Sequence, residues 1–214
     1  MTIRTLTRRA ALAAATGLAS VVLAACGGGS DDGGAHGAHG SPASPSGSAG
    51  AAAHNAQDVT FAQGMIPHHQ QALEMARLAA GRASSAQVKD LASRIEKAQD
   101  PEIRTMTGWL KAWGRQVPAA GTDHAGHGGM PGMSGMSGMM SDTDMAALKK
   151  ASGKDFDTKF LSLMVEHHQG AVEMATTEKD KGAYGPAKGM AGDIVGAQNA
   201  EIKQMKQLLG RNGS

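Results

Sequence analysis

The sequence has little of the material for disulfide frameworks, aromatic cores or nucleotide sites. Its single cysteine excludes an internal disulfide and a zinc cluster built from cysteines. Aromatic residues make up 3% of the 214 positions, so a core must come mainly from aliphatic side chains and the 14 methionines. Such a core suits closely packed helices better than a β-sandwich, which depends on aromatic and β-branched residues. No GxGxxG or Walker-type phosphate loop occurs, and nucleotide chemistry therefore has no support.

A strong excess of charge of one sign is also absent. The formal net charge is +2, but three of the arginines lie in the first 25 residues. Those residues are predicted to be removed on export, which leaves 18 basic and 19 acidic residues. The exported chain therefore offers no basic surface for nucleic acid.

The N-terminal region is predicted to be a lipoprotein signal peptide over residues 1–25. Arg4, Arg8 and Arg9 precede an apolar run of about 16 residues, which is shorter than the ~20 that a membrane-spanning helix needs. The run ends in Leu-Ala-Ala-Cys, which resembles a bacterial lipobox with Cys26 as the lipidated residue. The arginine pair resembles a twin-arginine signal, and the general and twin-arginine export routes both stay open. We expect a protein that is exported and anchored by lipid on the extracytoplasmic face of a bacterial membrane.

The segment 26–54 combines the lipidated cysteine with a run of Gly, Ser, Ala and Pro that has almost no bulky apolar residue. This composition is typical of a flexible tether. The folded domain is predicted to occupy residues 55–210.

The folded domain contains a motif that occurs twice at an offset of 99 residues. Residues 61–76 read FAQGMIPHHQQALEMA, and residues 160–175 read FLSLMVEHHQGAVEMA. This duplication, and apolar residues at three- and four-residue steps, predict two helical hairpins in repeats 55–114 and 154–210. We expect main helices at about 56–81, 86–114, 154–181 and 187–209, and a short helix near 142–151. The predicted fold is an all-α, antiparallel four-helix bundle.

Each repeat carries two adjacent histidines, which are His68 with His69 and His167 with His168. Adjacent residues on a helix point about 100° apart, so the two rings of a pair lean toward different neighbouring helices. Folding each hairpin at its turn places a Gln-x-x-Glu pair across from the histidines: Gln99 with Glu102, and Gln198 with Glu201. A carboxylate on the apolar face of a helix is costly without a partner, so each glutamate should meet a histidine, a metal or a buried donor.

A methionine three residues before each histidine pair, Met65 or Met164, shares a helix face with the histidines. Imidazole and thioether together favour copper, and the thioether suits Cu(I) in particular. The two glutamates either ligate the ion or orient the histidine rings. The alternative is a buried histidine–glutamate network with methionine filling the core. Because the whole set is duplicated, we favour the metal site.

The linker over residues 115–141 carries a second group of soft donors. Between positions 123 and 140 it reads DHAGHGGMPGMSGMSGMM. Its candidate ligands are His124, His127, Met130, Met133, Met136, Met139 and Met140. Methionines in a Gly/Ser background have no core to fill, and a flexible chain of this kind can wrap Cu(I) or Ag(I). The alternative is a low-complexity linker without a role in metal binding.

These motifs resemble the bacterial domain-of-unknown-function 305 family. The resemblance rests on MIPHHQQALEMA, ASGKDFDTKFLSLMVEHHQGAVEMA and AQNAEIKQMKQLL, and it covers roughly residues 55–210. It implies a ferritin-like four-helix bundle, often exported, with copper binding in some members. Carried over to this chain, it points to the two Met-x-x-His-His motifs and the Met-rich linker. The Glu-x-x-His pairs of di-iron ferritin-like proteins do not occur here, so iron is a weaker candidate than copper.

The expected function is copper sequestration or transfer outside the cytoplasm, with a copper-handling protein as the partner in transfer. No catalytic constellation is found, because the only cysteine belongs to the lipobox and no Ser/His/Asp arrangement is evident. One rival hypothesis is a structural or interaction lipoprotein that binds no metal. The other is a metal-dependent oxidoreductase, which would need a redox-cycling ion with an open ligand position.

Overall fold

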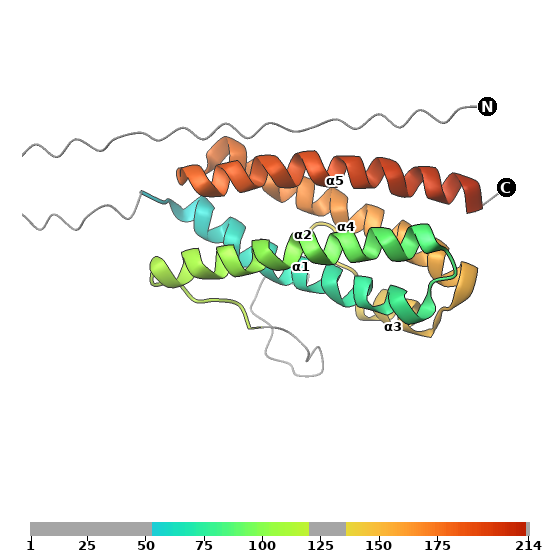
Figure 1. Cartoon of the computed structure of the whole chain (residues 1–214). Helices are drawn as coiled ribbons and strands as arrows, with labels where there is room; N and C mark the ends of the chain where they lie inside the picture. The colour runs from blue at the N-terminus through green and yellow to red at the C-terminus, as the bar shows by residue number, and fades with distance from the viewer. Residues whose placement is uncertain (1–52, 120–135, 213–214) are drawn as a thin grey trace, which may run out of the picture. The chain divides into compact units, whose positions relative to one another are not determined.

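The structure, a computed structural model, describes residues 53–119 and 136–212, and this part of the chain is all helical. Its helices are α1 (Ala56–Arg82), α2 (Ala86–Ala112), α3 (Asp142–Lys150), α4 (Gly153–Lys181) and α5 (Gly185–Asn212). Helices α1 and α2 form one hairpin, and α4 and α5 form the other (Figure 1). The predicted all-α bundle of two hairpins is therefore confirmed. Among the residues described, no helix is both long enough and apolar enough to cross a bilayer.

Helix ends agree with the predicted ones to within a few residues, and local chemistry explains where they fall. The Asn55 side chain accepts hydrogen bonds from the backbone N–H groups of Gln57 and Asp58, and so caps α1. Ser85 caps α2 in the same way through Val88. Helix α5 begins two residues earlier than predicted, because Pro186 lies in its first turn, where a missing N–H costs nothing.

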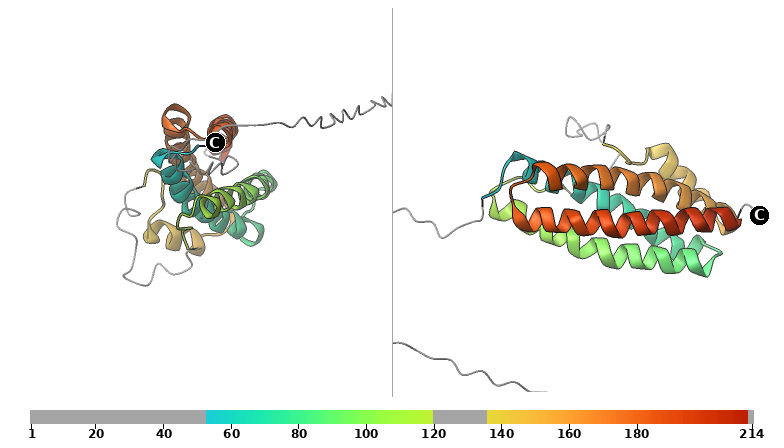
Figure 2. Two further views of the ribbon diagram at one scale, coloured as in Figure 1. Left: turned by 90° about the vertical axis from the view of Figure 1, so that its left-hand side faces the viewer. Right: turned by 90° about the horizontal axis from the view of Figure 1, so that it is seen from above.

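The two hairpins meet through α1 and α4, which pack against each other, while α2 packs on α1 and α5 packs on α4. The Asn55 amide donates to the carbonyl of Lys181, so the start of α1 lies beside the end of α4 and the two helices are antiparallel. Seen end-on in Figure 2, the four long helices surround a common axis. Side chains that point inward from both repeats therefore face one another.

Two buried aspartates, 99 residues apart, tie the hairpins together. Asp157 on α4 accepts hydrogen bonds from the backbone N–H groups of Ser84 and Ser85 in the α1–α2 turn, and from the Ser84 hydroxyl. Asp58 on α1 accepts from the backbone N–H groups of Ala183 and Tyr184 in the α4–α5 turn. Each turn is thus held by the first helix of the other repeat, which fixes the register of α1 against α4.

The hydrophobic core consists of two separate clusters. One cluster includes Phe61, Met65, Met106, Ala175 and Ile194. The other includes Met75, Ile95, Phe156, Met164 and Met205. On each of the four long helices, a polar pair lies between the two clusters: the adjacent histidines on α1 and α4, and Gln-x-x-Glu on α2 and α5. We call these residues the histidine layer, and they separate the two apolar clusters.

Candidate metal centre

The four histidines of the layer are completely buried. Because neighbouring side chains on a helix diverge by about 100°, the two rings on each helix face different partners. His68 on α1 faces His167 on α4, whereas His69 faces Glu102 on α2. His168 makes the corresponding contact with Glu201 on α5. The predicted divergence of the paired rings is therefore what the structure contains.

The imidazoles form a row that runs across the bundle. The ring centroids of His68 and His167 are 3.7 Å apart at the centre of the row. The centroid separations within the pairs are 6.5 Å for His68 and His69, and 6.4 Å for His167 and His168. The spacing of the repeats is compatible with one shared centre or with two separate ones, and the packing of α1 on α4 brings the histidines into one row.

Each end of the row is closed by a carboxylate. The distance from Nε2 of His69 to Oε2 of Glu102 is 2.7 Å, and the distance from Nε2 of His168 to Oε2 of Glu201 is also 2.7 Å. The glutamate side chains are 23% and 17% exposed, so they reach from solvent into the layer. In the neutral tautomer that a carboxylate partner selects, Nε2–H donates to the glutamate and the other nitrogen, Nδ1, keeps its lone pair.

Many polar atoms of the layer have no hydrogen bond. The buried atoms without a partner are both ring nitrogens of His68 and His167, Nδ1 of His69 and His168, and Oε1 of Gln99 and Gln198. Leaving a buried polar atom unpaired costs roughly 1–3 kcal/mol. A layer with this many unpaired polar atoms therefore destabilises the fold, and the nitrogen lone pairs of its neutral imidazoles are available to a metal ion.

The central histidines are neutral at physiological pH. Burial, followed by the nearby His69 and His168 rings, lowers the pKa of His68 from 6.5 to about 3. Burial and the other three rings lower the pKa of His167 well below 6.5. The backbone of Ser137 lies close enough to His68 to oppose this shift, although neither ring nitrogen has a hydrogen bond of ordinary geometry. A neutral imidazole binds a metal ion without first losing a proton.

The other predicted ligands of the bundle lie next to the layer rather than in it. Met65 and Met164 are completely buried, each in a different hydrophobic cluster, so one flanks the layer on each side. Within residues 53–119 and 136–212, no three groups from His, Cys, Asp and Glu converge on one point in this conformation. A bound ion would therefore need a rotated ring or a thioether to complete its ligand set.

Part of the Met-rich linker is described, and it packs on the bundle. Met136, Met139 and Met140 are all partly buried, and Met140 contacts the core. The Gln71 side chain holds the backbone of Met140 through two hydrogen bonds of 2.7 and 2.9 Å. The expectation that these methionines have no core to fill is thus wrong for Met140. The candidates His124, His127, Met130 and Met133, and the predicted lipidation site Cys26, lie outside the described residues.

The linker is seated at positions where the duplicated motif differs between the repeats. Gln71 corresponds to Gly170, and a methyl group on Gly170 would overlap the carbonyl oxygen of Ser137. Only glycine therefore admits the linker backbone on α4, while the Gln71 side chain holds it on α1. Sequence reasoning missed Gln71 and Gly170, although their mismatch within a matching motif is a detectable sign of an asymmetric role.

Comparison with known proteins places this fold and motif in a family. The sequence model of the domain of unknown function DUF305 matches residues 58–209. A DUF305 protein from Streptomyces coelicolor is 34% identical, with 74% of this chain and 94% of that chain covered and a TM-score of 0.64. A DUF305 fragment from Deinococcus radiodurans is 34% identical, with coverages of 73% and 97% and a TM-score of 0.63.

CopM is a third similar structure, solved in several metal-bound forms. In its Cu(II)-bound form CopM is 37% identical, with 72% of this chain and 96% of that chain covered and a TM-score of 0.60. CopM has also been solved with Cu(I) and with Ag. No curated protein matches this chain. The family model and these structures together show that the chain belongs to the DUF305 family.

Proposed function

We propose that this chain is an extracytoplasmic lipoprotein, lipidated at Cys26, that binds copper and holds it for sequestration or for transfer to a partner protein. The observation that carries the proposal is the buried pair of His68 and His167, whose four ring nitrogens have no hydrogen bond. The similarity to CopM, which has been solved with copper and silver, supports copper as the ion. The Streptomyces coelicolor neighbour is described as a secreted protein, which supports the extracytoplasmic location.

The donor set of the layer suits a soft or borderline cation. Uncharged imidazoles flanked by thioethers favour copper over magnesium or calcium, which prefer oxygen ligands. In this proposal His68 and His167 supply the central nitrogens, and the glutamates hold His69 and His168 in the tautomer that leaves Nδ1 free. The protein binds and releases an ion, and no catalytic step is assigned to it.

A structural role without metal is the second candidate, and one observation favours it. The outer histidines are already paired with carboxylates at 2.7 Å, as expected for a satisfied buried network. This role predicts that the layer binds no copper and that added copper leaves the melting temperature unchanged. Copper binding to the folded state predicts a rise in melting temperature, because a ligand that binds only the native protein stabilises it by mass action.

Anaerobic Cu(I) titration against a competing chelator tests the proposal. The chain from Gly27 onward contains the whole bundle and lacks the thiol of Cys26. Changing His124, His127, Met130 and Met133 to serine removes four of the seven candidate linker donors, whose binding would otherwise mask the layer. In this background, H68Q together with H167Q should weaken Cu(I) binding by at least the roughly 10–100-fold that loss of an outer partner costs a metal site.

The matched control is H54Q, because His54 is partly exposed and stacks on Trp113, away from the layer. It should leave the affinity unchanged. Equal affinity in the H68Q/H167Q protein, with its helical content intact by circular dichroism, would contradict the site in the layer. Absence of tight binding in every variant would contradict copper binding by the bundle and favour the structural role.

A further inference from the structure

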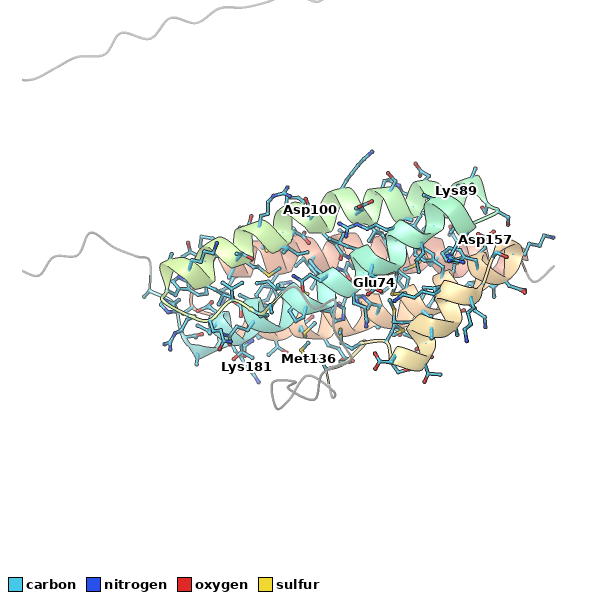
Figure 3. The ribbon with its side chains drawn as sticks, turned by 90° about the horizontal axis from the view of Figure 1, so that it is seen from below. Glu74, Lys89, Asp100, Met136, Asp157 and Lys181 are labelled. Atoms are coloured by element: carbon cyan, nitrogen blue, oxygen red, sulfur yellow. The ribbon has the colours of Figure 1, made fainter. Side chains whose placement is uncertain are left out.

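Two methionine sulfur atoms from different parts of the chain meet at one glycine of α1. A methyl group placed on Gly64 would lie 3.4 Å from Sδ of Met136 and 3.6 Å from Sδ of Met174. Met136 belongs to the linker segment that runs along the bundle (Figure 3), and Met174 belongs to α4. Both side chains are partly exposed, so an ion can reach the two thioethers from solvent.

The duplication shows that this arrangement exists on one side of the bundle only. Leu163 occupies the position that corresponds to Gly64, and Met75 occupies the position that corresponds to Met174. Met75 is completely buried in the core, whereas Met174 is only partly buried. On the leucine side the corresponding methionine is therefore enclosed in the core, while on the glycine side two partly exposed thioethers lie over the backbone of Gly64. We call this place, where Gly64 has no side chain, the gap.

The gap lies close to the histidine layer. Gly64 precedes His68 by one helical turn on α1, which is about 6 Å along the axis. The linker backbone beside Met136 covers the same region, since a methyl group on Gly138 would lie 2.8 Å from the carbonyl oxygen of His167. An ion held by the two sulfur atoms would thus be within one helical turn of the central imidazoles.

A negative charge lies beside the gap. The hydroxyl of Ser137, the residue after Met136, donates to Oε2 of Glu173 at 2.6 Å, and Glu173 precedes Met174. This carboxylate is exposed, so it attracts a cation without holding a buried charge. Thioethers are uncharged and do not titrate, and they select Cu(I) and Ag(I) over hard divalent ions.

We propose that the thioethers of Met136 and Met174 form an outer binding site for Cu(I) or Ag(I), from which the ion passes to His68 and His167. This inference rests on the proposed function and adds a path for the ion from solvent, because the four histidines of the layer are completely buried. Transfer is a ligand exchange without redox chemistry: two sulfur–metal contacts are released as nitrogen–metal contacts form. Gly64 is the positioning residue, since a methyl group there would already touch both sulfur atoms and a longer side chain would compete with them for the same space.

Nuclear magnetic resonance with Ag(I) as the probe can observe the two sites separately. Methyl-¹³C methionine reports the outer site, and imidazole-¹⁵N histidine reports the layer. The protein is the chain from Gly27 onward with the four linker donors changed to serine. The first additions of Ag(I) should shift the Met136 and Met174 methyl signals together, and the layer nitrogens should follow.

M174L should remove the Ag(I)-induced shift of Met136 and slow the change at the histidines, because one of two shared ligands is lost. Leucine nearly conserves the volume of methionine, so the fold should persist. The matched control is M190L, which changes a partly exposed methionine of α5 outside this site. Control and parent proteins should respond alike.

The failures of the two proposals are distinguishable. Histidine nitrogens that shift while the methyl signals of Met136 and Met174 stay unmoved would overturn the outer site and leave the layer intact. A Met136 shift that survives M174L would overturn the shared site. Methyl shifts without any change at the histidines would overturn the passage of the ion to the layer, and with it the proposed function.

Discussion

Glu178 makes the stability of this protein fall as the pH rises from acid to mildly alkaline values. Its side chain is completely buried near the end of α4, and neither carboxyl oxygen has a hydrogen bond of ordinary geometry. Burial, and then the neighbouring carboxyl of Asp58, raise the pKa of Glu178 from 4.5 to about 8. Between these two values the folded state therefore holds a proton that the unfolded state has lost.

The sign and size of the effect follow from this difference. The contribution of Glu178 to stability is fully present below pH 4.5 and is lost as the pH rises through about 8. At about 1.4 kcal/mol per pKa unit, the full shift would be worth at most about 5 kcal/mol. Rearrangement at the end of α4 relieves part of the repulsion between carboxylates, so we expect on the order of 2–3 kcal/mol.

E178Q isolates this contribution, because an amide cannot ionise and so never places a second negative charge beside Asp58. Near pH 5 the variant and the parent should have the same free energy of unfolding. Above pH 8 the variant should be more stable by about 2–3 kcal/mol. His68 and His167 act in the opposite direction below pH 6.5, since the unfolded chain binds protons that these buried rings do not. The comparison of E178Q with the parent cancels this histidine effect.

Urea denaturation of the metal-free protein at pH 5, 6.5 and 8.5 provides the measurement. The control is E166Q, because Glu166 is an exposed carboxylate on the same helix. It should leave the pH dependence unchanged. If the free energy of unfolding depends on pH in the same way for E178Q and the parent over this range, the reasoning about the buried carboxyl pair is refuted.

Two further predictions concern a contact between the two repeats and a contact of the linker with α4. D157A should lower the free energy of unfolding by about 2–4 kcal/mol, because it leaves the N–H groups of Ser84 and Ser85 unpaired. The control is D155A, at an exposed site on α4, which should lower it much less. Equal losses in the two variants would contradict the role of Asp157. G170A should dislodge the linker segment from α4 and speed proteolysis within residues 136–140, since the added methyl group would overlap the backbone of Ser137. The bundle itself should keep its melting temperature, as Gly→Ala favours a helix by roughly 0.5–1 kcal/mol; an unchanged cleavage rate would show that the linker does not depend on this contact.

Several features of the fold could be read from the sequence because they depend on local spacing. The repeat at an offset of 99 residues and the helical periodicity predicted two hairpins, and the structure has them. The 100° turn between adjacent residues predicted that His68 and His69 would face different helices, and folding the hairpin predicted that Glu102 would lie opposite. These expectations involve one helix or one turn at a time, so no knowledge of the packing between hairpins was needed.

The contacts between repeats were decided by tertiary structure. The offset of the repeats is equally compatible with two separate histidine sites, and only the packing of α1 on α4 places His68 and His167 3.7 Å apart. That packing depends on Asp58 and Asp157, whose partners lie 125 and 73 residues away in sequence. Spacing within a helix carries no information about such distant pairs.

The linker also makes contacts that its composition and spacing do not predict. Its composition predicted free methionines, but Gln71 and Gly170 seat residues 136–140 on the bundle. The sequence by itself therefore determined the helices and the chemical kinds of donor that they carry. Tertiary structure decided which donors meet, because the layer and the shared gap at Gly64 exist only where faces of different helices and the linker come together.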